Sequence, residues 1–281
     1  MPRVSVIIPT RNRASFLCEA IESVLRQTYR DFELIVVDDG STDVTSYLSD
    51  RWRGQIRWIR QAHAGVSRAR NVGIQRSRGR YLSFLDSDDL WVADKLETQV
   101  RFLDANPHYP VCYTDEVWIR RGRRVNPKRS HRKYSGWIFE QCLPLCIISP
   151  SSVMMRREVL DTVGLFDETL PVCEDYDLWL RVTSRFPVFF LEKKLIIKRG
   201  GHADQLSNRS WGNDRYRVRA LEKQLLPNRL TPPERRAALE MIQRKCLILA
   251  GGFLRRGKMD QGQRYKTLAE KYGQDMEAER L

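Results

Sequence analysis

The stretch Tyr81–Trp91, which reads YLSFLDSDDLW, constrains the fold more than any other part of the chain. Its first five residues are apolar or small, a pattern typical of a buried strand. The run then ends at three carboxylates, Asp86, Asp88 and Asp89. In an extended chain, side chains two residues apart project from the same side. Asp86 and Asp88 are therefore expected to point the same way from the end of a strand.

Two neighbouring carboxylates repel each other unless a positive charge lies between them. Their oxygens are hard ligands, and Mg2+ or Mn2+ is the natural counter-ion. Mg2+ usually takes one or two carboxylates and completes its shell with water and substrate phosphates. The stretch therefore predicts half of a metal site that receives a phosphorylated ligand. The alternative is that Ser87, Asp88 and Asp89 open a helix near Leu90, since first helical turns favour the same residues.

Strand-like and helix-like patterns alternate along the chain up to this stretch. Apolar runs predict strands over residues 4–8, 32–37, 56–60 and 81–85, with helices over about 15–27, from about 44, and over 67–75. Pro9 has no N–H to donate and is expected to end the first strand. Ser15 is expected to cap the first helix. This alternation is typical of an α/β fold with a mainly parallel sheet.

Polar loops follow three of these predicted strands, at Thr10, Asp38 and Asp86. Parallel sheets bind ligands outside the carboxyl ends of their strands. The three loops are therefore expected to converge on one crevice, which favours a functional site over three unrelated helix caps.

The alternation breaks after one more helix, over residues 94–105. Residues 116–134 are basic and predict a hairpin around Gly122, and Glu174 opens a later helix. The other elements expected here are helices over 137–143 and 157–162 and strands over 111–113, 151–155, 188–191 and 195–198, with a charged turn over 192–194.

From Trp211 the chain reads as an appendage of charged amphipathic helices. The sequence TPPE at 231–234 is a strong helix start, because proline suits the first helical positions. Gly251, Gly252 and Gly257 are expected to interrupt the helix that begins there.

The net charge of +14 points to an anionic partner. The basic residues gather at Arg120–Arg124, Lys128–Lys133 and from Arg215 onward. They lack the interleaved aromatic residues of a base-stacking platform and any zinc-finger or helix-turn-helix signature, which argues against nucleic acid. A membrane surface with acidic lipids, or a polyphosphate ligand, fits them better.

No apolar run approaches the ~20 residues that span a bilayer, and no signal-peptide pattern opens the chain. A cytoplasmic protein, peripheral at the inner face of the membrane, is therefore expected. The six cysteines form no C-x-x-C pair, which favours reduced thiols. Cys142 and Cys146 are expected to share one helix face.

Five strings carry a resemblance to a known family. They are VSVIIPTRNR, LIVVDDGSTD, GVSRARNVGI, YLSFLDSDDLW and GLFDETLPVCEDYDLWLR, in this order over residues 3–207. Together they resemble the family 2 inverting glycosyltransferases of the GT-A fold, an α/β fold with a Rossmann-like mixed sheet. The resemblance implies a GT-A domain over residues 1–210, with a donor half at 1–115 and an acceptor half at 116–210, followed by a helical region at 211–281.

The resemblance implies a nucleotide-sugar site in the donor half. Pro9, Thr10 and Arg11 would wall the nucleoside pocket. Asp39 would accept from the base, expected to be the uracil imide, and Asp38 would serve the structure. Arg70 would orient the acidic motif or meet the diphosphate, because arginine recognises both anions.

The acidic stretch matches the DXD motif of that family. Asp88 and Asp86 are assigned to a divalent cation, Mn2+ or Mg2+, with Asp86 and Ser87 also placed at the donor nucleotide. His202, in GGHADQLS, corresponds to a histidine that family members often carry near the metal or diphosphate. A surface histidine is the alternative.

Glu174 and Asp175 match the acidic pair on the acceptor side. Inversion by direct displacement needs one base for the acceptor hydroxyl, and Asp175 is expected to be that base, with Glu174 in reserve. Helix capping is the structural alternative. The Q-x-x-R-W motif of processive members is missing, which favours transfer of a single sugar.

The expected function is a metal-dependent, non-processive inverting glycosyltransferase in surface polysaccharide or lipopolysaccharide synthesis. It would move one sugar from a UDP-linked donor to a hydroxyl of a glycan or lipid-linked acceptor. Transfer to a polyprenyl phosphate and a non-catalytic nucleotide-sugar or glycan-binding module are the alternatives.

Overall fold

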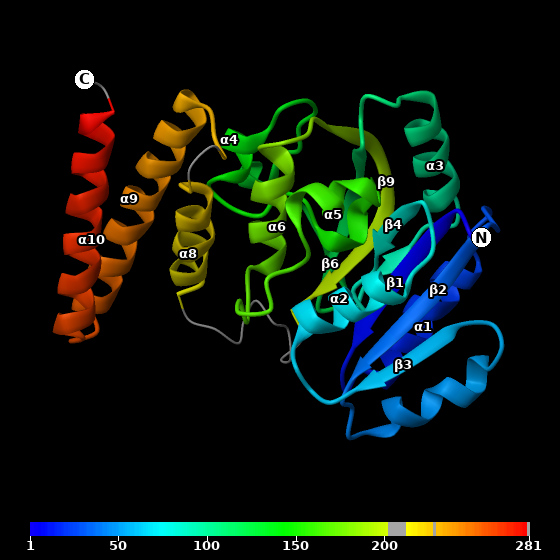
Figure 1. Ribbon diagram of the computed structural model, residues 1–281. Helices are drawn as coiled ribbons and strands as arrows, with labels where there is room; N and C mark the ends of the chain where they lie inside the picture. Colours follow the sequence, from blue (N-terminus) through cyan, green and yellow to red (C-terminus); the bar gives the residue numbers. More distant parts are fainter. Residues whose placement is uncertain (202–211, 227–228, 280–281) are drawn as a thin grey trace.

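A computed structural model describes residues 1–201, 212–226 and 229–279. A single mixed sheet runs through the described part, and helices pack along it (Figure 1). Its strands are β1 Val4–Thr10, β2 Phe32–Asp39, β3 Arg57–Gln61, β4 Tyr81–Phe84, β5 Leu90–Trp91, β6 Val111–Arg120, β7 Arg123–Val125, β8 Val153–Arg156 and β9 Val188–Gly200. The strand order is β3-β2-β1-β4-β8-β6-β9-β5, and β7 pairs with β6.

The helices connect these strands and then form a group of their own. The α-helices are α1 Ala14–Leu25, α2 Val66–Arg76, α3 Lys95–Ala105, α4 Phe139–Cys142, α5 Glu158–Val163, α6 Glu174–Thr183, α8 Asp214–Gln224, α9 Pro232–Leu254 and α10 Met259–Ala278. Short 3-10 helices lie at η1 Val44–Trp52, η2 Arg129–His131 and η3 Pro150–Ser152. None of the described helices combines the length and apolar character needed to cross a membrane.

The parallel part of the sheet confirms the alternation expected from the sequence. Strands β3, β2, β1 and β4 pair in parallel, so their carboxyl ends meet at one edge. Strand β8 enters antiparallel between β4 and β6, and β6 pairs in parallel with β9. Helix α2 packs closely against β1 and β2. Gly73 permits this approach, because a Cβ at this position would lie 2.4 Å from the Ile7 side chain.

Pro9 does not end β1, contrary to expectation. The strand continues to Thr10, and Pro9 pairs with Val37 of β2. Odd-numbered residues of β1 face β4, as the Tyr81 N–H donation to the Arg3 carbonyl shows. β4 has already ended at the level of Pro9, so no hydrogen bond between the strands is lost because Pro9 lacks an N–H.

No helix begins at Leu90, which was the structural alternative for Ser87, Asp88 and Asp89. Leu90 and Trp91 form β5 and pair with Ile197 and Ile196 of β9. Ser15 lies inside α1, whose N-cap is Arg13 without a side-chain cap. The acidic residues therefore shape a turn between two strands, where the Asp89 N–H donates to the Asp86 carbonyl at 2.9 Å.

Three further expectations about element boundaries fail. β9 is one strand, and the register shift opposite Thr114 and Asp115 makes the charged residues at 192–193 a bulge rather than a turn. α9 runs through Gly251 and Gly252, and only Gly257, with φ of 69°, marks a break. α4 ends at Cys142, so Cys146 does not share its helix face.

The C-terminal helices are part of the main core. Val218 of α8 and Ile242 of α9 belong to the same buried cluster as Trp179 of α6 and Tyr113 of β6. Figure 1 places α8 beside α6, with α9 and α10 beyond it. The described helices after residue 211 therefore pack into the same core as β6 and α6.

Candidate active site

The acidic turn after β4 is held by a serine from the other half of the domain. The Asp86 N–H donates to Ser151 Oγ at 3.1 Å, and Ser151 Oγ donates to Asp89 Oδ2 at 2.7 Å. Asp89 also accepts from the Arg199 N–H at 2.9 Å. Burial raises the pKa of Asp89 well above its ordinary value, and Asp88 and Asp86 raise it further. Asp89 thus braces the turn from inside, and Asp86 and Asp88 remain as its outer carboxylates.

Asp88 is neutralised by an arginine that the motif alone does not reveal. Arg13 Nη1 lies 2.6 Å from Asp88 Oδ2, and both side chains are largely buried. Arg13 follows β1, in the polar loop expected to reach the same crevice. The signal for it was this convergence of loops. Arg199, which donates from its Nε to the Asp88 carbonyl, had no comparable signal.

Arg70 joins the acidic turn to the carboxylate pair of α6. Its Nη2 donates to Asp86 Oδ1 at 2.7 Å, and its Nη1 donates to Glu174 Oε1 at 2.6 Å. The side chain is 3% exposed and lies over the Phe166 ring, 5.1 Å from its centroid. Burial alone would lower the pKa of Arg70, but the two carboxylates outweigh it and raise that pKa. A permanent cation thus lies between the two acidic motifs.

The two carboxylates at the start of α6 have different surroundings. Glu174 is buried against Arg70, and burial, followed by repulsion from Asp175, raises its pKa to about 7. Asp175 is only half-buried. Its Oδ1 accepts from the Tyr176 N–H at 2.7 Å, and its Oδ2 accepts from the Cys146 thiol at 3.3 Å. Of the pair, Asp175 is the one with the more accessible side chain.

The residue before this pair has a strained backbone. Cys173, the N-cap of α6, has φ of 64° and ψ of 21°, in the left-handed region. A residue with a Cβ adopts this conformation at a cost, and such residues concentrate at functional sites. The turn sets the direction in which Glu174 and Asp175 leave the backbone.

Asp39, at the end of β2, holds the loop that leads into α2. Oδ1 accepts from Gln61 Nε2 and the Ala64 N–H, at 2.7 and 2.8 Å. Oδ2 accepts from His63 Nδ1 and the Gly65 N–H, at 2.7 and 2.9 Å. These four donors fill the lone pairs of the carboxylate. Its role toward a nucleoside base stays a prediction.

The His63 ring links Asp39 to Arg11. Arg11 Nη1 lies 2.8 Å from His63 Nε2. Because a guanidinium can only donate, Nε2 accepts and Nδ1 carries the proton that is donated to Asp39. Thr10 is buried beside this network, and its Oγ1 has no hydrogen-bond partner among the described residues. Pro9 and Thr10 lie beside Val37 and Asp38 at the carboxyl edge of the sheet.

A divalent cation fits the acidic turn in donor type. Asp86 Oδ1 binds Arg70, and Oδ2 makes no hydrogen bond to the described residues in a side chain that is 30% exposed. The described residues contain no group of three His, Cys, Asp or Glu that could hold a metal. Mg2+ usually takes only one or two carboxylates and completes its shell with water and substrate phosphate. Ser87 is buried within the turn. His202 lies outside the described residues.

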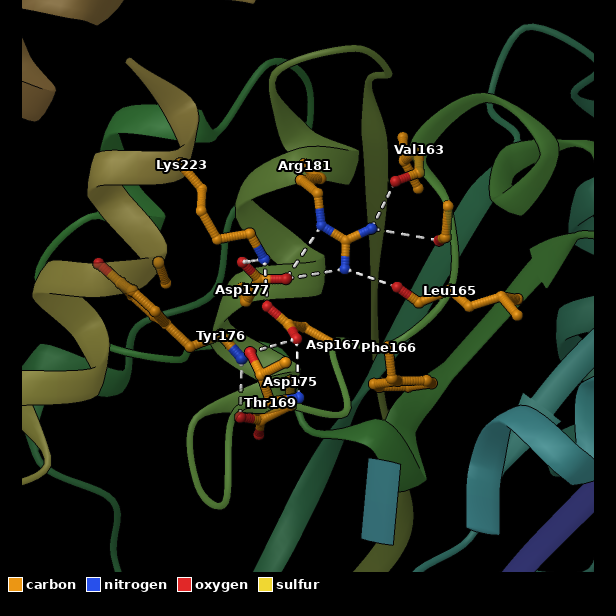
Figure 2. Close-up of polar contacts among 12 residues, drawn as sticks. Val163, Leu165, Phe166, Asp167, Thr169, Asp175, Tyr176, Asp177, Arg181 and Lys223 are labelled. Atoms are coloured by element: carbon orange, nitrogen blue, oxygen red, sulfur yellow. Dashed lines mark hydrogen bonds and ion pairs between the residues drawn. The ribbon is translucent and has the colours of Figure 1, made fainter. Parts of the chain in front are cut away.

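A second polar cluster supports α6 on the side facing the C-terminal helices. Figure 2 shows Arg181 donating to the carbonyls of Val163 and Leu165 and to Asp177 of its own helix. Lys223 of α8 donates to Asp167 Oδ2 at 2.7 Å and to Asp177 Oδ1 at 2.6 Å. α8 thereby ties α6 to the loop before it. Sequence reasoning missed this cluster, because no motif marks Lys223.

Comparisons with known proteins agree with this architecture. Residues 5–164, more than half of the chain, match the family described as Glycosyl transferase family 2. An uncharacterized glycosyltransferase of Rickettsia felis is 37% identical over 196 residues, which is 69% of this chain and 32% of that protein. The matched part thus spans about a third of that relative.

A relative of more similar length comes from Escherichia coli. It is named UDP-Glc:alpha-D-GlcNAc-diphosphoundecaprenol beta-1,3-glucosyltransferase WfaP, and it is 31% identical over 192 residues, 66% of this chain and 72% of that one.

Two solved structures share the fold at low identity. S. aureus TarS 1-349 in complex with UDP-GlcNAc has a TM-score of 0.64 and 20% identity, covering 97% of this chain and 92% of its own. The mannosyltransferase PcManGT from Pyrobaculum calidifontis, in complex with GDP-Man and Mn2+, has a TM-score of 0.60 and 19% identity, covering 97% and 84%. They confirm the expected GT-A-type α/β fold. The chain belongs to glycosyl transferase family 2.

Proposed function

We propose that this chain transfers one sugar, with inversion, from a UDP-linked donor to a hydroxyl of a lipid-linked or cell-surface glycan. The observation that carries the proposal is the bridge from Asp86 through Arg70 to Glu174, at 2.7 and 2.6 Å. It puts the acidic turn and the carboxylate pair of α6 in one site. The name of WfaP, a UDP-Glc-dependent enzyme acting on a diphosphoundecaprenol-linked sugar, supports this donor and acceptor class.

The donor half is residues 1–115. Pro9, Thr10 and Arg11 border the nucleoside, and the base imide takes the place of His63 as donor to Asp39. His63 is the replaceable partner, because its side chain is 50% exposed while the backbone donors are part of the α2 start.

Asp86 and Asp88, with Ser87 in the turn and His202 after β9, hold a divalent cation, Mn2+ or Mg2+, and the donor diphosphate. When bound, the cation neutralises charge on the departing diphosphate. Arg70 keeps Asp86 in place and balances the charge of Glu174, which positions the second carboxylate beside it.

The acceptor half is residues 116–210, with the helices of 211–281 bracing it. Asp175 removes the proton from the acceptor hydroxyl. The acceptor oxygen then forms a bond to the anomeric carbon on the face opposite the nucleotide. The bond from that carbon to the diphosphate breaks, and UDP leaves with the electron pair. The cytoplasmic, membrane-proximal location expected from the sequence suits a lipid-linked acceptor.

Calorimetric titration of UDP, with and without Mn2+, tests the donor half. Wild type should bind in the micromolar range with the metal, and Asp88→Asn should lose the metal-dependent part. Asp94→Asn, a carboxylate at the start of α3 that pairs with Lys193, is the matched control and should bind as wild type does. Binding that ignores both the metal and Asp88 would contradict the assignment of the acidic turn.

A second variant separates binding from chemistry. Asp175→Asn should retain UDP binding and lose transfer by roughly 10²–10⁴-fold, the usual contribution of a general base. Products should be glycosides of a hydroxyl. If the sugar is instead transferred to a polyprenyl phosphate, the proposed acceptor class is wrong. UDP binding without any turnover would point to a non-catalytic module.

A further inference from the structure

The outer face of α9 carries apolar side chains that the protein leaves in solvent. Leu247 and Ile248 are 54% and 56% exposed. They lie opposite the buried face of the helix, which contributes Cys246, Leu249 and Phe253 to the core. Single exposed apolar residues are ordinary, but a group of them on one surface marks an interaction site.

Two more exposed apolar residues flank the turn that follows. Leu254, at the end of α9, is 39% exposed, and Met259, at the start of α10, is 63% exposed. We call Leu247, Ile248, Leu254 and Met259 the apolar tip. The four lie within one end of the α9–α10 hairpin.

Cations surround the apolar tip. Arg244, Arg255 and Lys258 are exposed, and we call them the basic rim. Arg244, Leu247, Ile248, Gly251 and Arg255 follow a spacing of three and four residues, so they share one stripe of α9. Asp260 is the one acidic residue between 244 and 264. The surface is therefore apolar at its centre and positive at its edge.

The positive charge of the basic rim indicates which partner binds this surface. A second copy of this chain docking through the same surface would place one basic rim against another, because a two-fold interface uses the same patch on both subunits. An anionic lipid surface offers the opposite charge and also a medium for apolar side chains. The combination of apolar centre and basic edge is that of a helix that binds in a membrane interface.

The position of the hairpin suits this occupant. In Figure 1 the turn between α9 and α10 lies at the lower left of the molecule, and β9 also runs downward toward its carboxyl end. Arg199, near that end, contacts the acidic turn of the candidate active site.

We propose that the apolar tip and the basic rim dock the protein on an anionic lipid bilayer. The four apolar side chains enter the interface, and the rim contacts the lipid headgroups. The proposal concerns binding alone and does not rest on the proposed transferase activity.

Vesicle flotation of the full chain, at low and at physiological salt, tests the docking. The vesicles contain phosphatidylcholine alone or with phosphatidylglycerol. The tip variant carries Leu247→Ser, Ile248→Ser and Met259→Ser. The rim variant carries Arg244→Glu, Arg255→Glu and Lys258→Glu. The control carries Arg123→Glu, Arg124→Glu and Lys128→Glu, an equal charge change at exposed sites in β7 and just after it.

Wild type should bind the anionic vesicles, and both the tip and the rim variant should lose roughly tenfold or more in partitioning. The control should lose less than about threefold. Circular dichroism and thermal unfolding of each variant establish that it is folded, and UDP titration of the tip variant reports on the donor site separately.

Five outcomes would overturn the proposal. The first two are wild type that does not float with anionic vesicles and wild type that binds neutral vesicles equally well. The third is a control variant that loses as much binding as the rim variant, which would make the attraction a property of net charge. The fourth is a tip variant that binds as wild type does. The fifth is a dimer in sedimentation velocity that the tip variant dissociates, which would assign the surface to a second copy.

Discussion

The Arg70 guanidinium donates to the Glu174 carboxylate at 2.6 Å, across 104 residues of sequence. The same guanidinium reaches Asp86 on its other side. One buried guanidinium therefore stabilises the acidic turn that follows β4 and the carboxylate at the start of α6. Without Arg70, the carboxylates of Asp86 and Glu174 would lie near each other with no positive charge between them.

Replacing Arg70 should be costly. Arg70→Gln leaves two carboxylates without their shared cation, and breaking a buried ion pair in this way costs about 3–5 kcal/mol of unfolding free energy. Urea unfolding measures it. Arg68→Gln, on the same helix, removes an exposed contact to Glu168 at 3.4 Å and should change stability by at most about 1 kcal/mol. Equal stability of the two variants would refute the bridge.

The protonation of Glu174 should appear in the pH dependence of stability. Its pKa is raised from 4.5 to about 7 in the folded state, chiefly by burial. The folded protein therefore binds this proton more tightly than the unfolded chain, and the contribution of Glu174 to stability declines as pH rises from about 4.5 to about 7. Glu174→Gln cannot ionise and lacks this decline. Urea unfolding of both proteins across the window should show wild type losing stability relative to the variant, and an opposite slope would refute the assignment.

Asp39 should control the order of the loop before α2. Asp39→Asn replaces one accepting oxygen with an N–H₂ group. This group would point at donors of His63, Ala64 or Gly65 and could not accept their hydrogen bonds. Each hydrogen bond that is lost destabilises the closed loop by about 1–3 kcal/mol. The backbone amides of Ala64 and Gly65 should therefore exchange with solvent at least tenfold faster than in wild type. UDP affinity should fall as well. Asp31→Asn, at an exposed position before β2, is the control. Unchanged exchange would show that the loop is ordered by other contacts.

Lys223 should couple the C-terminal helices to the acceptor side. Lys223→Met removes two charge-assisted hydrogen bonds, to Asp167 and Asp177, and leaves Asp177 buried with Arg181 as its remaining partner. We expect a loss of about 1–3 kcal/mol in unfolding free energy, measured by urea denaturation. Lys266→Met, at an exposed position of α10, should change it by less than about 0.5 kcal/mol. A Lys223 variant as stable as this control would mean that α8 is held by apolar packing alone.

The regular elements of residues 1–115 were largely predictable from the sequence, because continuous apolar runs and loop residues report local structure. The parallel strands followed from these patterns. The loop of Arg13 was expected near the acidic turn, but the pairing of Arg13 with Asp88 was not predicted. Alternatives remained open where one residue pattern suits two structures. Ser87, Asp88 and Asp89 suit a helix start as well as the turn before β5, and pairing with β9 decided for the turn.

Tertiary pairing also decided the later elements. The charged residues between 192 and 194 read as a turn, but β6 pairs with β9 on both sides of them and absorbs them as a bulge. Gly251 and Gly252 read as a helix break, yet α9 continues through them while its buried face packs into the core. In both cases long-range contacts outweighed the local propensity.

The sequence by itself determined the fold class, the four parallel strands within residues 1–90 and the polar loops that follow three of them, because these depend on local apolar patterns and on the order of motifs. Only the tertiary structure decided how those residues are paired. Arg70 reads as one position on a helix, and its contacts with Asp86 and Glu174 exist because the sheet brings α2, the end of β4 and α6 together. Charge balance at a buried site depends on distances between remote residues, which no local pattern encodes.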